Sequence, residues 1–120
     1  MTRAWYLGCR PADVGERAVL VGDPGRIELF AEQLDDVCPI GDNRGLRSIT
    51  GSSGGLPVTV SAFGMGAPIA AIVLEELAQL GVRAVLRVGT VLTLVPGRSA
   101  SSSSPPPPCA RRASRGRTRR

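Results

Sequence analysis

An arginine ends the short turn that follows a predicted strand, where its guanidinium could bind an anion. Arg26 ends the segment 22–26, which follows an apolar run. Gly22 permits a tight turn, Asp23 can cap a helix, and Pro24 suits a first helical position. A helix amino terminus offers free N–H groups, and a forked guanidinium suits phosphate. The segment therefore has two interpretations, an anion site and an ordinary strand-to-helix turn with a solvated arginine. The turn alone favours the second, because its glycine spacing matches neither the dinucleotide nor the P-loop pattern.

A second arginine, Arg87, interrupts the otherwise apolar run 84–88 and is followed by Gly89 and Thr90. Burying a guanidinium is costly unless it is paired or bound to an anion. We therefore predict that Arg87 and Thr90 are directed at a bound anion. The alternative is an edge strand that leaves the Arg87 guanidinium in solvent.

The elements that must position these residues alternate between strands and helices. We expect strands at 18–22, 46–50, 57–62 and 84–88, a helix at 24–34, and a second helix from 67 to Gly81. This alternation predicts an α/β fold with a mixed, largely parallel sheet flanked by helices. In such sheets ligands collect at the carboxyl ends of strands, which here carry 22–26, 64–66 and 87–90.

The segments between these elements have weaker signals. The run 37–40 is a short edge strand at best, because Pro39 cannot donate to a ladder. A turn is expected at 41–43 and a flexible hairpin tip at 51–55. The second helix is expected to place Glu75, Glu76 and Gln79 opposite its apolar side, which comprises Ile69, Ile72, Val73, Leu77 and Leu80.

Composition excludes several classes of site. The chain has no histidine, which removes serine–histidine and cysteine–histidine nucleophile pairs and the commonest zinc ligand, so we expect no metal. The three cysteines, Cys9, Cys38 and Cys109, are far apart and show no CxxC spacing, so we expect no disulfide framework. We therefore expect the protein to be located in the reducing cytoplasm. Neither a secretory signal nor a bilayer-length apolar run is visible, and we expect no membrane partner.

Five motifs together resemble the amino-terminal portion of the nucleoside phosphorylase family, and its uridine phosphorylase branch most closely. They are GDPGR at 22–26, NRG at 43–45, FGMGAP at 63–68, LEELAQLGVR at 74–83 and RVGT at 87–90. The resemblance covers about residues 4–97. It implies an enzyme that cleaves a nucleoside with inorganic phosphate as co-substrate, gives free base and ribose 1-phosphate, and needs no cofactor.

The resemblance also implies roles for individual residues. The arginine of the NRG motif would reach the phosphate of a neighbouring subunit, so a homo-oligomer is expected. No residue is assigned as catalytic. The site residues so implied are Gly22, Arg26, Arg44, Arg87 and Thr90 for phosphate, and Met65 for ribose.

The chain departs from the family pattern in three places. Tyr6 replaces a histidine that reaches a neighbour's ribose, and the segment 91–93 replaces a glycine-containing one. The family's second half, with its base-binding residues, has no counterpart. We therefore expect impaired phosphorolysis of uridine or a related nucleoside. The alternative is a non-catalytic fragment that at most binds phosphate, and the sequence does not specify the base.

The composition changes abruptly after Gly97. Residues 1–97 carry a net charge of −2 and are expected to form the amino-terminal part of the phosphorylase domain, whereas residues 98–120 carry +7. We expect 98–120 to be a disordered Ser/Pro/Arg tail, and we hypothesise that a frameshift near Gly97 produced it. A basic arm on nucleic acid is a less favoured alternative, because the tail has no aromatic residue to stack on bases.

Overall fold

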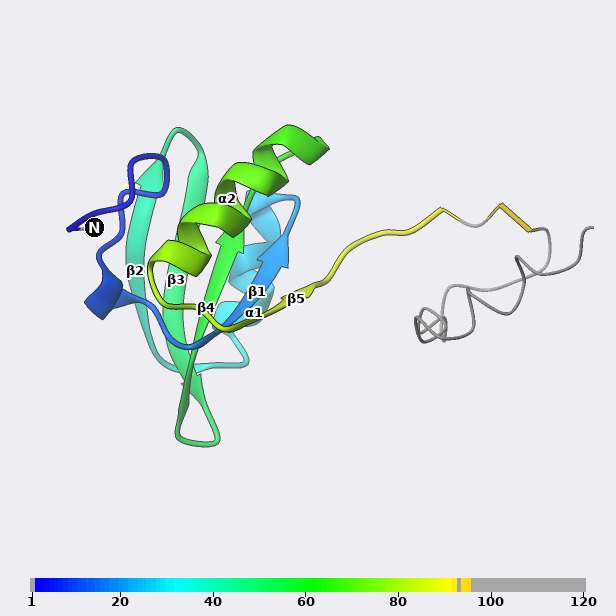
Figure 1. Ribbon diagram of the computed structural model, residues 1–120. Helices are drawn as coiled ribbons and strands as arrows, with labels where there is room; N and C mark the ends of the chain where they lie inside the picture. Colours follow the sequence, from blue (N-terminus) through cyan, green and yellow to red (C-terminus); the bar gives the residue numbers. More distant parts are fainter. Residues whose placement is uncertain (1, 93, 96–120) are drawn as a thin grey trace, which may run out of the picture. The chain divides into compact units, whose positions relative to one another are not determined.

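The computed structural model describes residues 2–92 and 94–95 (Figure 1). The chain divides after Gly89 into two units, and the first of them holds all the described helices and strands. The predicted tail at 98–120, and with it the frameshift hypothesis, lies outside the described residues.

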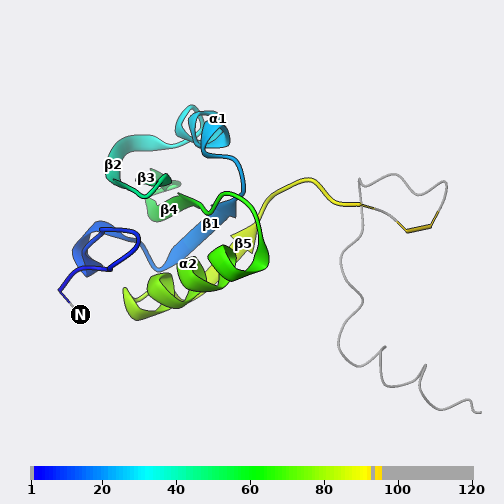
Figure 2. The same ribbon diagram turned by 90° about the horizontal axis from the view of Figure 1, so that it is seen from above.

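The first unit is built around a five-stranded mixed sheet with the order β2-β3-β4-β1-β5. β1 is parallel to β4 and to β5, whereas β3 is antiparallel to β2 and to β4. The two α-helices cover opposite faces of this sheet (Figure 2). The mixed sheet flanked by helices confirms the predicted fold class. The elements are η1 (Pro11–Asp13), β1 (Arg17–Val21), η2 (Pro24–Arg26), α1 (Ile27–Ala31), β2 (Asp35–Asn43), β3 (Leu46–Ser53), β4 (Leu56–Ala62), α2 (Ala67–Gln79) and β5 (Ala84–Arg87).

The central strand β1 is packed on both faces because its side chains alternate between them. Ala18 and Leu20 join the apolar cluster that contains Val73 and Leu77 of α2. Val19 and Val21 face the other cluster, which contains Ile27 of α1. Burial on both faces fixes the position of the carboxyl end of β1, from which the first arginine segment leaves.

The turn that leaves β1 has the predicted capping chemistry. Oδ1 of Asp23 accepts a hydrogen bond from the N–H of Gly25 at 2.9 Å, and Pro24 begins η2. The helix predicted at 24–34 is shorter than expected, because its first turn is a 3-10 turn and α1 ends at Ala31. Ile27, Phe30 and Ala31 of α1 belong to or pack against one apolar cluster, and Leu34, which lies beyond the end of the helix, packs against the same cluster.

The sequence prediction for 37–43 was right about an edge strand but wrong about its length and about the turn at 41–43. β2 is a nine-residue edge strand, and its register shifts around Cys38 and Gly41 accommodate Pro39. Gly41 is not in a turn: a Cβ there would lie 2.5 Å from the carbonyl oxygen of Leu7, so glycine permits close packing. The turn lies instead at Arg44 and Gly45, with φ of 55° and 75°.

Glu76 was also assigned to the wrong face. It was expected on the polar side of the second helix, but it is only 6% exposed. Its Oε1 and Oε2 accept hydrogen bonds from the backbone N–H groups of Tyr6 and Leu7, each at 2.8 Å. The carboxylate therefore fastens the amino-terminal segment to α2.

Within the described residues, no helix combines the length and apolar character needed to cross a bilayer.

Candidate functional site

The carboxyl ends of β1, β4 and β5 meet at one edge of the sheet, and their backbone bonds continue past the strands. The N–H of Gly64 donates to the carbonyl of Gly22 at 2.8 Å, and that of Val88 donates to the carbonyl of Leu20 at 2.9 Å. The segments 22–26 and 64–66 and the end of β5 therefore lie together, as the sequence predicted.

Gly22 is required for a close approach at this edge. A Cβ on Gly22 would lie 3.2 Å from the carbonyl oxygen of Gly64 and 4.0 Å from Cζ of Phe63. A larger side chain would push the two strand ends apart. Gly22 thus keeps its own backbone, which the resemblance assigns to phosphate, next to the ring of Phe63.

Arg87 lies on β5, the edge strand of the described sheet, and is exposed. This is the edge alternative that the sequence left open. The guanidinium is nevertheless held in place, because its Cζ lies 5.3 Å from the centre of the Phe63 ring. Gly89 leaves room for this arrangement, since a Cβ there would be 3.0 Å from the Arg87 Cζ. No carboxylate pairs with Arg87 among the described residues.

The remaining predicted phosphate residues differ in how well they are placed. Arg26 is half-buried and ends η2, where its N–H donates to the carbonyl of Asp23 at 3.0 Å. It therefore stays close to the carboxyl end of β1, only four residues after Gly22. Thr90 follows the division of the chain after Gly89, so its role stays a prediction.

A cavity of about 360 Å³ adjoins this edge and contains two further predicted residues. Arg44, assigned to phosphate, and Met65, assigned to ribose, both line it, and Met65 is 90% exposed. The other lining residues are Tyr6, Gly45, Leu46, Phe63, Gly64 and Ile69.

Phe63 connects the two groups of predicted residues, because one ring carries the Arg87 guanidinium and lines the cavity of Arg44 and Met65. Sequence reasoning did not single it out. The available signal was an aromatic residue directly before the glycine turn 64–66. The arrangement can hold an oxyanion beside a small apolar surface.

No group of three or more His, Cys, Asp or Glu residues is placed to hold a metal in the part of the chain that is described.

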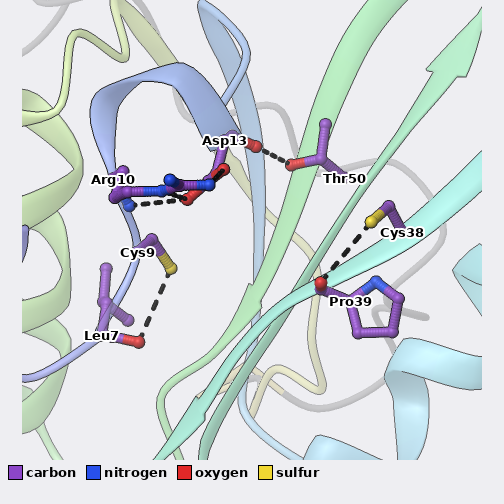
Figure 3. A network of polar contacts seen from close by, with 7 residues as sticks. All are labelled: Leu7, Cys9, Arg10, Asp13, Cys38, Pro39 and Thr50. Carbon is purple, nitrogen blue, oxygen red and sulfur yellow. Dashed lines mark hydrogen bonds and ion pairs between the residues drawn. The ribbon is translucent and has the colours of Figure 1, made fainter.

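A separate polar network lies at the amino end of β1 (Figure 3). Nε and Nη2 of Arg10 donate to the carboxylate of Asp13, each at 3.1 Å, and this holds the pKa of Asp13 below its usual value. The hydroxyl of Thr50 donates to the carbonyl of Asp13 at 2.7 Å. These contacts join the amino-terminal segment to β3, and we interpret them as structural.

The two described cysteines should differ strongly in reactivity. Cys9 is fully buried, and burial, with smaller contributions from the charges of Asp13 and Glu76, raises its pKa to about 11. Cys38 is exposed. Because the thiolate is the nucleophile, we expect iodoacetamide at pH 8 to modify Cys9 at least about a hundredfold more slowly than Cys38. Peptide mass spectrometry over time measures both rates. Similar rates in the native protein, rather than only in urea, would contradict the burial of Cys9.

Comparison with known proteins gives consistent matches. A family model described as the phosphorylase superfamily matches residues 16–100. The chain is similar to the uridine phosphorylase of Thermococcus kodakarensis, with 36% identity over 93 residues that cover 78% of this chain and 34% of that protein. It is also similar to the guanosine phosphorylase of Halorubrum lacusprofundi, with 38% identity over 90 residues, 75% of this chain and 37% of that protein.

A solved structure supports the same relationship. The crystal structure of uridine phosphorylase from Vibrio fischeri matches with a TM-score of 0.72 and 30% identity, over 75% of this chain and 38% of that one. The chain thus spans about a third of the length of the curated relatives it matches.

Proposed function

Because this chain belongs to the phosphorylase superfamily, we propose that it binds orthophosphate at the carboxyl ends of β1, β4 and β5 and acts in the phosphorolysis of uridine or a related nucleoside. One observation carries the proposal. The Gly22 turn, the Phe63–Gly64 segment and the Arg87 guanidinium, which lies over the Phe63 ring, converge at one sheet edge.

The proposed reaction explains why cationic, forked donors stand here. A phosphate oxygen forms a bond to C1′ of the ribose while the C–N bond breaks, and the base leaves with the electron pair and takes up a proton. The reacting sugar has oxocarbenium character, so a phosphate held on the face opposite the base stabilises it. Arg26 and Arg87 would orient the phosphate through bidentate hydrogen bonds, which lowers the entropic cost of the encounter.

The cavity beside this edge supplies the second half of the proposal. Met65 would contact the ribose, and Arg44 would serve the phosphate site of a neighbouring copy, so at least a dimer would be needed. Binding of Arg44 to a phosphate in its own subunit is the other arrangement that its place in the cavity allows.

The cytoplasm is the proposed location of the protein, because Cys9 and Cys38 are free thiols.

A second candidate function is phosphate binding without catalysis. It is favoured by the length of the match, which covers only 34% of the uridine phosphorylase of Thermococcus kodakarensis. The family resemblance assigns the residues that bind the base to the family's second half, which this match does not cover.

Purified protein incubated with uridine, or with guanosine, and orthophosphate separates these candidates. Chromatography measures release of free base, and ³¹P NMR measures formation of ribose 1-phosphate. We expect base release that needs phosphate and is lost when Arg87 is replaced by alanine.

Each other outcome has a distinct meaning. Base release without phosphate would indicate hydrolysis and overturn the phosphorylase proposal. Phosphate binding, measured by calorimetric titration, without any base release would support the second candidate. Absence of both binding and release would contradict both candidates.

A further inference from the structure

The backbone around Tyr6 is fastened from two sides. Glu76 accepts hydrogen bonds from the N–H groups of Tyr6 and Leu7, each at 2.8 Å. Nδ2 of Asn43 donates to the carbonyl oxygens of Tyr6 at 2.9 Å and of Trp5 at 3.2 Å. The position of Tyr6 is therefore fixed relative to both α2 and the β2–β3 turn, although its side chain is 38% exposed.

The same fastening brings Tyr6 to Arg44. Asn43, which holds the carbonyl of Tyr6, directly precedes Arg44 in the chain. Arg44 and Gly45 both have positive φ, as in the two-residue turns that fit the twist of a hairpin. In this arrangement Cζ of Arg44 lies 5.2 Å from the centre of the Tyr6 ring. The ring and the guanidinium therefore meet at the cavity that both residues line.

A cation–π contact holds a guanidinium without using its N–H groups as donors to a charged partner. No carboxylate pairs with Arg44 in the described part of the chain. The guanidinium is thus held by an uncharged partner, which does not neutralise it. This is the arrangement expected of a group that must bind an anion from solution.

We propose that Tyr6 is a positioning residue for Arg44, whose guanidinium its ring holds through a cation–π contact so that the N–H groups can take an oxyanion. The proposal rests on the proposed function in one respect, since the oxyanion is taken to be orthophosphate. It assigns Tyr6 a role that differs from the ribose contact that the family resemblance implies for the histidine at this position. The ring, and not the hydroxyl group, performs this role.

The test compares Tyr6→Phe, which keeps the ring, with Tyr6→Leu, which removes it. NMR of the full chain follows the side-chain Nε–H of Arg44, assigned by its loss in Arg44→Lys. We expect a ring-current shift of this proton in the wild type and in Tyr6→Phe, but not in Tyr6→Leu. Titration with orthophosphate should give affinities within twofold of each other for the wild type and Tyr6→Phe, and at least a fivefold weaker one for Tyr6→Leu. Trp5→Leu is the matched control, because Trp5 is 78% exposed and should leave both readouts unchanged.

Three results would overturn the proposal and leave the proposed function intact. Absence of the ring-current shift in the wild type would contradict the stacking itself. Equal loss of phosphate affinity in Tyr6→Phe and Tyr6→Leu would assign the role to the hydroxyl group. Phosphate binding that leaves the Arg44 resonance unmoved would remove Arg44 from the site without affecting the proposed function. A wild type that binds no phosphate at all would instead contradict the proposed function, and the role of Tyr6 would be lost with it.

Discussion

Replacing Arg87 with alanine is expected to weaken orthophosphate binding at least tenfold. A charge-assisted hydrogen bond to an anion contributes about 1.5–3 kcal/mol, and about 1.4 kcal/mol corresponds to a factor of ten in affinity. Arg87 is exposed and has no carboxylate partner among the described residues, so its removal should cost little stability. Calorimetric titration with orthophosphate measures the change.

Arg83→Ala is the matched control for this variant. Arg83 is also an exposed arginine, but it lies at the opposite end of β5, directly before Ala84. The Arg83→Ala variant should bind phosphate as the wild type does, because the charge that it removes lies at the other end of β5 from the proposed site. Arg87→Lys should show intermediate affinity, since it keeps the charge but loses the forked pair of N–H donors. Equal weakening by Arg83→Ala and Arg87→Ala would show a nonspecific effect of net charge.

Replacing Glu76 with alanine is expected to lower the free energy of unfolding by about 3 kcal/mol, because two backbone N–H groups lose their acceptor and buried donors without a partner cost about 1–3 kcal/mol each. The N–H groups belong to Tyr6 and Leu7, and Leu7 is fully buried. For a domain whose total stability is about 5–15 kcal/mol, this loss is large. Urea unfolding followed by circular dichroism measures it.

Glu75→Ala gives the comparison for Glu76. The two glutamates are neighbours on α2, but Glu75 is exposed, and its side chain makes no hydrogen bond within the described residues. Its replacement should change the free energy of unfolding by less than about 0.5 kcal/mol. Similar values for both variants would mean that helix propensity, not the anchoring of the amino-terminal segment, determines the effect.

The features that the sequence predicted well are those with local causes. Asp23 and Pro24 define the start of η2 through their own backbone and side chains, and the structure shows the predicted cap. Ile27, Phe30 and Ala31 reach one apolar cluster because they follow helical spacing within α1. The alternation of strands and helices then brings the carboxyl ends of the strands together, so the place of the candidate site followed from topology.

The features that were missed depend on contacts between distant segments. Glu76 looks polar by helical spacing, and its partners lie 69 and 70 residues away in the sequence. Gly41 has the composition of a turn, but the nearby carbonyl of Leu7 explains it. The stacking of Arg44 on Tyr6 joins segments that share no local pattern. A single sequence gives no signal for such pairs.

We expect the segment 22–26, Gly64 and Arg87 to form one orthophosphate site. Two-dimensional ¹H–¹⁵N NMR of the full chain, titrated with orthophosphate, shows whether they do. We predict saturable shifts in the backbone amides of Gly22 to Arg26 and of Gly64 and in the side chain of Arg87, with no change at the hairpin tip, Gly54 and Gly55. Shifts confined to the arginines after residue 97, or spread evenly over all arginines, would contradict the account.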